Sequence, residues 1–368
     1  MNVLIIGEFS AFAKHLKAGF KQLGHNVTIT QDGDGWKNIE GDNDDICYKE
    51  YVLRFMGKDI PHTAIFSILK ANRFIKRKLR EKYENQRPDL IIVINYIFTS
   101  SSINQAGVKL SDIQHYVNKG SKLILSVCGG DPAMRYTYPD IYKEWGQDPF
   151  PIQDDRYSFL IAHAHKIIPT TYLYYEAIRN YSSYESFDVG KISRAIPLPM
   201  TTDEKCQISS CLERKIVIFH GIIRPLMKGT FFIQPAMERI QKEFPDRVVC
   251  ICKGNMPYDE YVKVFENVDV LIDQASGGNG WGINAAIGAM KGKCVLTTCG
   301  PENGENMGIP DIPFVQIKRD ENHIYETLKR LILHPEEIDK IKFKSRKFME
   351  QYCDSRIIAK RYLEEVNL

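Results

Sequence analysis

The chain has 368 residues, enough for two domains that each bury a core of their own. Hydrophobic residues make up 43% and charged residues 26%, which is the composition of an ordinary soluble globular protein. A formal charge of +3 is too small to indicate nucleic acid as the main partner. The nine cysteines show neither metal-site nor disulfide spacing, which suits a reducing compartment.

Neither a signal peptide nor a membrane span is expected. The first apolar run covers residues 3–6 and then meets Gly7-Glu8. No stretch approaches the roughly 20 apolar residues that cross a bilayer. We therefore expect a cytoplasmic protein.

Strand and helix patterns alternate through the first half of the chain. A buried strand at residues 2–6, a helix at 11–23 closed by Gly24, and a strand at 27–29 predict a right-handed crossover in a parallel sheet. Further strands are expected at 90–94, 122–127 and 166–169. We expect an N-terminal domain over residues 1–200 and a linker at the polar, unpatterned residues 201–214.

Two turns at the edge of this first sheet hold candidate site residues. Gly7, with Ser10 close behind, follows the first strand, and the glycine lets that turn approach an acceptor or the other domain. Asp131 follows two glycines after the strand at 122–127, where parallel sheets bind ligands, and we take it as a catalytic candidate. Asp131 also fits a helix N-cap before Pro132, and one residue can serve both roles.

A helical pattern at residues 60–82 carries a basic face. Seven basic residues accompany the single acid Glu81: Lys70, Arg73, Lys76, Arg77, Lys78, Arg80 and Lys82. One interpretation is a solvated surface helix. The other is a patch that contacts anionic lipid headgroups or an acidic acceptor.

The alternation begins again at residue 215, which predicts a C-terminal domain over 215–350. Strands are expected at 215–219, 248–252, 270–273 and 294–296, and helices at 228–244, 258–266 and 283–290. Three more helices follow, and the segment 351–368 is placed to pack back on the N-terminal domain. The pattern predicts two doubly wound α/β domains that face each other across a cleft.

The stretch from Val270 to Asn306 is the most informative part of this domain. A strand, a turn dense in glycine, a helix of small residues, a second strand and an acidic loop make a βαβ unit. Glycines let the backbone approach a ligand, and the first turn of a helix favours an anion. The alternative is a glycine-rich surface turn, since no complete dinucleotide or Walker pattern is present.

The loop after the strand at 215–219 reads HGIIRPLMKGT and holds two cations four positions apart, Arg224 and Lys228. Arg224 can bind two oxygens at once and Lys228 adds a point charge, so the pair suits a diphosphate. Both residues are expected on the surface of the cleft, and the alternative is that both are only solvated charges.

These motifs resemble a known family. HGIIRPLMKGT, PYDEYVKVFENVDVLIDQ, the glycine turn and PENGEN resemble the donor domain of GT-B glycosyltransferases of the "glycosyl transferases group 1" type. MNVLIIGEFS, DGDGWKN and LSVCGGD resemble the acceptor domain of a polysaccharide-building branch. The resemblance implies a nucleotide-sugar donor, UDP- or GDP-linked, a glycan or lipid-linked acceptor, retention of anomeric configuration and no metal or other cofactor.

The resemblance also implies roles for particular residues. Arg224 and Lys228 would grip the diphosphate. The donor-binding candidates are Gly221, Lys253, Pro257, Gly278, Asn279, Gly280, Trp281, Asn284, Glu302 and Glu305.

One departure from the family concerns a pair of glutamates eight positions apart. Counting back from Met290, this chain has Gly280 and Gly288 there, and Glu302 or Glu305 would reach the ribose instead. A sugar-nucleotide 2-epimerase, or a nucleotide-sugar-binding protein without catalysis, are therefore the competing functions.

Overall fold

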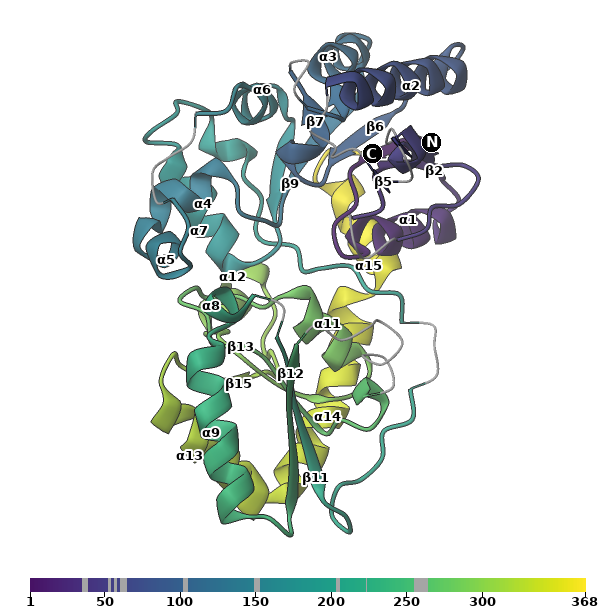
Figure 1. Cartoon of the computed structure of the whole chain (residues 1–368). Helices are drawn as coiled ribbons and strands as arrows, with labels where there is room; N and C mark the ends of the chain where they lie inside the picture. The colour runs from purple at the N-terminus through teal and green to yellow at the C-terminus, as the bar shows by residue number, and fades with distance from the viewer. Residues whose placement is uncertain are drawn as a thin grey trace.

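The computed structural model describes residues 1–34, 39–51, 54–55, 58–59, 65–101, 105–148, 153–202, 206–222, 224–254 and 264–368. Two parallel sheets divide the chain into an N-terminal and a C-terminal domain, which lie at the top and bottom of Figure 1. The residues of the expected helix at 258–266 are described only from 264 onward.

The N-terminal sheet has six strands in the order β10-β9-β6-β1-β2-β3, all parallel. The strands are β1 (Asn2–Ile6), β2 (Asn26–Gln31), β3 (Ile46–Cys47), β6 (Leu90–Val93), β9 (Lys122–Val127) and β10 (Lys166–Pro169). Two short pairs lie outside it: β4 (Arg54–Phe55) with β5 (Lys58–Asp59), and β7 (Thr99–Ser100) with β8 (Val108–Lys109).

Helices cover both faces of this sheet, which explains why its central strands β1 and β6 carry apolar side chains toward both faces. Successive side chains point to opposite faces, so Val3 and Ile5 enter one core and Leu4 and Ile6 another. The helices are α1 (Phe12–Gln22), α2 (Ile65–Tyr83), α3 (Leu110–Asn118), α4 (Pro132–Thr137), α5 (Pro139–Glu144), α6 (Asp155–His163) and α7 (Tyr172–Tyr181).

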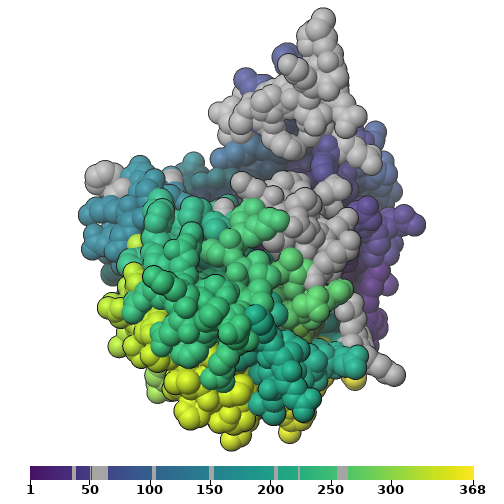
Figure 2. Space-filling view, turned by 60° about the horizontal axis from the view of Figure 1, so that its bottom comes forward, coloured from purple at the N-terminus to yellow at the C-terminus, as the bar shows by residue number. Residues whose placement is uncertain are grey.

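The C-terminal sheet has five parallel strands in the order β12-β11-β13-β14-β15. They are β11 (Ile216–Ile222), β12 (Val248–Gly254), β13 (Val270–Gln274), β14 (Cys294–Thr297) and β15 (Val315–Gln316). Its helices are α8 (Pro225–Lys228), α9 (Thr230–Glu243), α11 (Ile283–Met290), α12 (Glu302–Met307), α13 (Glu321–Leu333) and α14 (Pro335–Phe348). Figure 2 shows this half of the chain, green to yellow, with the N-terminal half behind it.

The chain passes between the domains twice, and the two passages are hydrogen-bonded to each other. Met200 and Asp354 form a parallel bridge, in which the Met200 amide donates to the Cys353 carbonyl at 2.8 Å and the Ser355 amide to the Met200 carbonyl at 2.9 Å. The second passage follows a π-helical turn at Met349–Cys353 and continues into the last helix, α15 (Ser355–Glu364).

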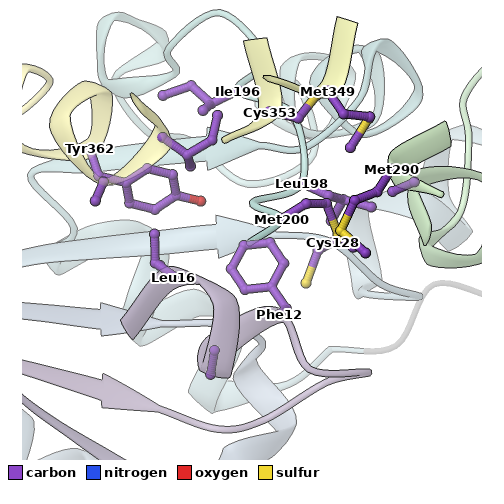
Figure 3. Packing of buried hydrophobic residues seen from close by; sticks show 14 of the residues in the cluster. Phe12, Leu16, Cys128, Ile196, Leu198, Met200, Met290, Met349, Cys353 and Tyr362 are labelled. Atoms are coloured by element: carbon purple, nitrogen blue, oxygen red, sulfur yellow. The ribbon is translucent and has the colours of Figure 1, made fainter. Parts of the chain in front are cut away.

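Helix α15 packs on the N-terminal domain, beside α1 (Figure 1). Its Tyr362 is fully buried, and the Tyr362 hydroxyl lies 3.0 Å from that of Ser126 on β9. One apolar cluster runs through both passages and joins the domains, with Phe12 and Leu16 of α1, Met200, Met349 and Met290 packed together (Figure 3).

The largest difference from the sequence-based expectation in this half is at residues 302–307. We expected an acidic loop, and the structure has the short helix α12, which ends at Gly308 in the left-handed conformation. Glycine and asparagine within ENGENM hid the helix, because both are poor helix formers. None of the helices in the described ranges is long and apolar enough to cross a bilayer.

The contact between α1 and α15 is tight enough to test. A Cβ placed on Gly19 would lie 1.9 Å from the Ser355 carbonyl oxygen, so Gly19→Ala must push α15 away from α1. Because such overpacking is destabilising, we expect Gly19→Ala to lower the free energy of unfolding by about 1–3 kcal/mol. Urea denaturation measures this change. Lys14→Ala, an exposed change on the same helix, is the control. Equal stability of the two variants would contradict this packing.

Candidate functional site

The loop after β11 leads into the one-turn helix α8, where Arg224 is the N-cap residue and Lys228 the last residue. Arg224 is exposed, and its Nη1 lies 3.8 Å from the sulfur of Met227. Gly229 then has a φ of 67°, and a Cβ there would lie 2.2 Å from the Ala275 carbonyl oxygen. A glycine is therefore required for the loop to lie against the end of β13.

The Lys228 ammonium is held at the beginning of α11. Its Nζ donates to Oδ1 of Asp273 at 2.6 Å and to Oε1 of Gln274 at 3.4 Å. The other oxygen of Asp273 accepts from the amide of Gly282, the N-cap residue of α11, at 3.1 Å. Asp273 is 2% exposed and the Lys228 side chain 16%, so Lys228 is a partly buried, ion-paired cation and not a fully solvated surface charge.

An irregularity in β13 allows this arrangement. The register of β13 on β14 shifts between Ile272 and Gln274, as at a β-bulge. In a regular strand Asp273 and Gln274 would point to opposite faces, and here both side chains contact Lys228. Bulges of this kind re-aim side chains next to functional sites.

His220, in the same loop motif, has a structural role that the sequence did not reveal. It is fully buried, with Nδ1 2.9 Å from the Ile272 carbonyl oxygen and Nε2 2.9 Å from the Thr230 hydroxyl. A carbonyl only accepts, so Nδ1 carries the proton and Nε2 accepts from Thr230. Burial lowers the pKa of His220 to about 4, so the ring is neutral and ties β11 to β13 and α9.

The glycine turn approaches the N-terminal domain. A Cβ on Gly278 would lie 2.8 Å from the Leu173 side chain, and one on Gly280 would lie 2.9 Å from the Thr171 hydroxyl. The Leu173 amide donates to the Asn279 carbonyl at 3.2 Å. The predicted donor-binding residues Gly278, Asn279 and Gly280 are thus placed against the start of α7.

Trp281 and Asn284 lie on either side of the helix start and differ in exposure. Trp281 is 4% exposed, and its ring packs edge-on against Phe314 at 5.4 Å and Phe348 at 6.5 Å, measured between ring centroids. Its ring therefore belongs to the core of the C-terminal domain. Asn284 is half-buried in the first turn of α11, the turn beside which Lys228 is held.

Helix α12 fastens the two domains through asparagine side chains that the sequence did not single out. Asn303 is fully buried: its Oδ1 accepts from the Tyr172 amide at 3.0 Å and its Nδ2 donates to Oδ1 of Asn279 at 2.7 Å. The Oδ1 of Asn306 accepts from the Ala195 amide at 2.8 Å. Neither asparagine followed a pattern that would have indicated an interface.

The glutamates of this helix are exposed. Glu302 accepts from Nδ2 of Asn279 at 2.7 Å, so it braces the glycine turn. Glu305 lines a cavity of about 570 Å³ between α12 and β15, together with Asp311 and Gln316.

The remaining donor-binding candidates lie on the neighbouring strands or outside the described residues. Gly221 of β11 is paired with the exposed Lys253 of β12, and Pro257 lies outside the described residues.

On the acceptor side, Gly7 lets a neighbouring ring approach the turn after β1. Its φ is 97°, and a Cβ there would lie 2.0 Å from the ring of Phe98. Ser10, with a φ of 55°, donates its amide to Asp34 at 2.8 Å. Glu8 between them is fully buried and accepts from the amides of α1 at Ala13 and Lys14, and burial raises its pKa to about 7.

Asp131 is the N-cap of α4, as the alternative interpretation expected. Its Oδ1 accepts from the Met134 amide at 3.1 Å, and Pro132 occupies the first turn. The carboxyl is 2% exposed and burial raises its pKa to about 7. It lies among five tyrosines whose pKa values are raised mainly by burial and further by its charge: Tyr96, Tyr142, Tyr157, Tyr174 and Tyr181. The Asp131 carboxyl is therefore enclosed by protein side chains and is not exposed at the surface of the cleft.

A second inter-domain contact lies next to α8. Glu144 at the end of α5 forms an ion pair with Arg319, and Gln147 donates to the sulfur of Met227 at 3.8 Å. A Cβ on Gly277 would meet Ile141 at 3.2 Å. The carboxyl ends of the two sheets therefore face each other. The Lys228 loop, which is the segment after β11 that carries Arg224 and Lys228, lies between them with α5 alongside. Across the described ranges, no group of three or more His, Cys, Asp or Glu side chains is arranged to hold a metal ion.

The buried carboxyl of Asp131 predicts a pH dependence of stability. A folded-state pKa of about 7 against a usual 3.8 means that the folded state holds the proton more tightly, so stability falls as pH rises from about 4 through 7. Asp131→Asn keeps the N-cap acceptor without the charge. We expect the melting temperature of wild type to fall more between pH 5 and pH 8 than that of the variant. Glu8, with a similar shift, is common to both proteins, and parallel curves would contradict the assignment.

No family model and no curated protein matches this chain. Solved structures match over its whole length. Sucrose-phosphate synthase from Thermosynechococcus elongatus has a TM-score of 0.62 at 14% identity, covering 100% of this chain and 98% of that one. HepE from Anabaena, in complex with UDP and glucose, has a TM-score of 0.59 at 10% identity, covering 100% of this chain and 99% of that one.

UDP-GlcNAc 2-epimerase from Neisseria meningitidis, bound to UDP-GlcNAc, gives a TM-score of 0.54 at 13% identity and covers 100% of both chains. At identities this low the likeness shows the fold. The expected architecture of two Rossmann-like domains facing across a cleft, the GT-B fold, is confirmed.

Proposed function

We propose that the protein is a retaining, metal-independent glycosyltransferase that moves a sugar from a nucleoside diphosphate sugar to a glycan or lipid-linked acceptor. The observation that carries the proposal is the Lys228 ammonium held beside the first turn of α11, on the same loop as the exposed Arg224. A fixed cation, an exposed cation and a helix N-terminus together suit a diphosphate.

The chemistry follows from where charge develops. When the bond between the sugar C1 and the phosphate oxygen breaks, negative charge grows on the departing diphosphate. Lys228, Arg224 and the α11 amides stabilise that charge, and such preorganised groups lower barriers strongly. The acceptor hydroxyl bonds to C1 on the face that the phosphate leaves, and a phosphate oxygen takes its proton, so no separate base is required.

The acceptor belongs on the N-terminal side of the cleft, in the region of Gly7 and Ser10. We infer a growing polysaccharide or a lipid-linked sugar as the acceptor class, from the resemblance of the first half of the chain to enzymes that build polysaccharides. The same resemblance supports a cytoplasmic enzyme that uses a UDP- or GDP-linked donor.

The main competitor is an enzyme that rearranges a sugar nucleotide without an acceptor, because the 2-epimerase from Neisseria meningitidis shares this fold. A panel of UDP- and GDP-sugars, incubated with and without glycan acceptors and followed by mass spectrometry, separates the possibilities. A transferase yields free nucleotide and an extended acceptor, and an epimerase yields an isomeric sugar nucleotide. We expect turnover to survive EDTA. Loss of turnover that Mg²⁺ restores would contradict the metal-independent mechanism.

Arg224→Ala tests the exposed cation in the same assay. The side chain is exposed, so we expect an unchanged melting temperature and a rate lower by about 10²–10³, the usual effect of removing one donor to a developing anion. Lys242→Ala, an exposed cation of the same domain on α9, is the control. A wild-type rate in the Arg224 variant would remove it from the site.

We also propose that the basic face of α2 contacts anionic membrane. Its tip exposes Phe66 (73%) and Ile65 (48%), and only Arg77 and Lys78 share Glu81 among the ion pairs described within this helix. Each cation near an anionic surface contributes about 1 kcal/mol. We expect co-sedimentation with anionic but not neutral vesicles, lost at about 0.5 M salt, where the Debye length is below about 5 Å.

The matched variant replaces Arg73, Lys76, Arg77 and Arg80 with Gln. We expect it to lose vesicle binding and to keep donor hydrolysis, because α2 lies in the N-terminal domain, far from the Lys228 loop (Figure 1). If wild type ignores anionic vesicles at low salt, the face is only a solvated surface.

A further inference from the structure

We propose that Asp273 and Gln274 are positioning residues that fix the Lys228 ammonium at the first turn of α11, ready for the diphosphate of a nucleotide. The inference rests on the proposed function, because it assigns the residues that prepare its anion site. Both residues end the segment PYDEYVKVFENVDVLIDQ, but the sequence alone assigned neither of them a role.

The geometry assigns the two residues a joint role. The shift in register at the end of β13 brings both side chains to Lys228, at 2.6 Å and 3.4 Å from Nζ. Each also holds the glycine turn: Asp273 accepts from the Gly282 amide at 3.1 Å, and Gln274 donates to the Gly280 carbonyl at 3.3 Å. The lysine and the start of α11 are thereby fixed relative to each other.

Fixing matters because a lysine side chain is otherwise flexible. A free ammonium loses rotamer freedom when it binds a phosphate, and an ammonium already held in place loses less. Gly282 completes the arrangement, since a Cβ there would lie 3.2 Å from the Asp273 carboxylate and 3.6 Å from Nζ of Lys228. A larger residue would enter the space where the cation and the helix start meet.

The negative charge of Asp273 makes the test stringent. On its own, a carboxylate near the site repels a diphosphate, so its removal would strengthen nucleotide binding. A positioning role predicts the opposite, because the ammonium is no longer held. The sign of the change in affinity therefore distinguishes the two effects.

The test is a double-mutant cycle on the full chain with UDP and GDP as probes in titration calorimetry. Asp273→Asn keeps the side-chain shape but cannot serve both Lys228 and the Gly282 amide, which are both donors. We expect it to weaken binding about tenfold, and the charge-neutral Gln274→Ala to weaken it less. In a Lys228→Met background, Asp273→Asn should leave affinity unchanged or strengthen it, because the lysine through which it acts is gone.

Asp140→Asn, which removes an exposed carboxylate paired with Lys143, is the control for charge alone. Unchanged or tighter binding in Asp273→Asn, or equal losses with and without Lys228, would overturn the positioning role. If Asp273→Asn does not fold, the cycle of Gln274→Ala with Lys228→Met decides by the same criterion. If neither UDP nor GDP binds wild type, the proposed function fails; if binding needs Lys228 but neither neighbour, only this inference fails.

Discussion

The joined passage between the domains is the constraint on which the rest of the molecule depends. Met200 and Asp354 cross side by side, and Thr202 adds a side-chain bond to Asp354 at 2.5 Å. The apolar cluster of Figure 3 continues through this crossing, so the two domains share one core cluster in addition to the cluster that each has of its own. The contacts across the cleft, of α7 with the glycine turn and of α5 with α8, form in the domain orientation that this crossing holds.

The candidate site is built by backbone features more than by unusual side chains. Gly229 in the left-handed conformation lets the loop lie on β13, and the register shift in β13 turns two adjacent side chains toward one lysine. The buried, neutral His220 of β11 hydrogen-bonds to the Ile272 carbonyl and so ties β11 to β13. The charges of the site are Lys228, which is paired with Asp273, and Arg224, which is exposed.

Local pattern predicted the elements well because buried parallel strands and amphipathic helices repeat with fixed periods. The same pattern indicated the loop with Arg224 and Lys228, because that loop directly follows a strand that the sequence predicts. It could not show that Lys228 is paired with Asp273, because a bulge is a property of pairing between strands. It also missed Asn303 and Asn306, whose partners are backbone amides more than 100 residues away in sequence.

The place of α15 has a consequence for how the protein is made. The first domain completes its surface with residues 355–364, which the ribosome adds only after all strands of the C-terminal sheet. Until then α1 lacks the helix against which Gly19 fits, and Tyr362 is missing from beside Ser126. At roughly 5–20 residues per second, the interval between the end of the N-terminal sheet and α15 is on the order of ten seconds or more. During that interval the apolar face of α1 that α15 covers stays exposed on the nascent chain, so the N-terminal domain cannot complete this part of its core.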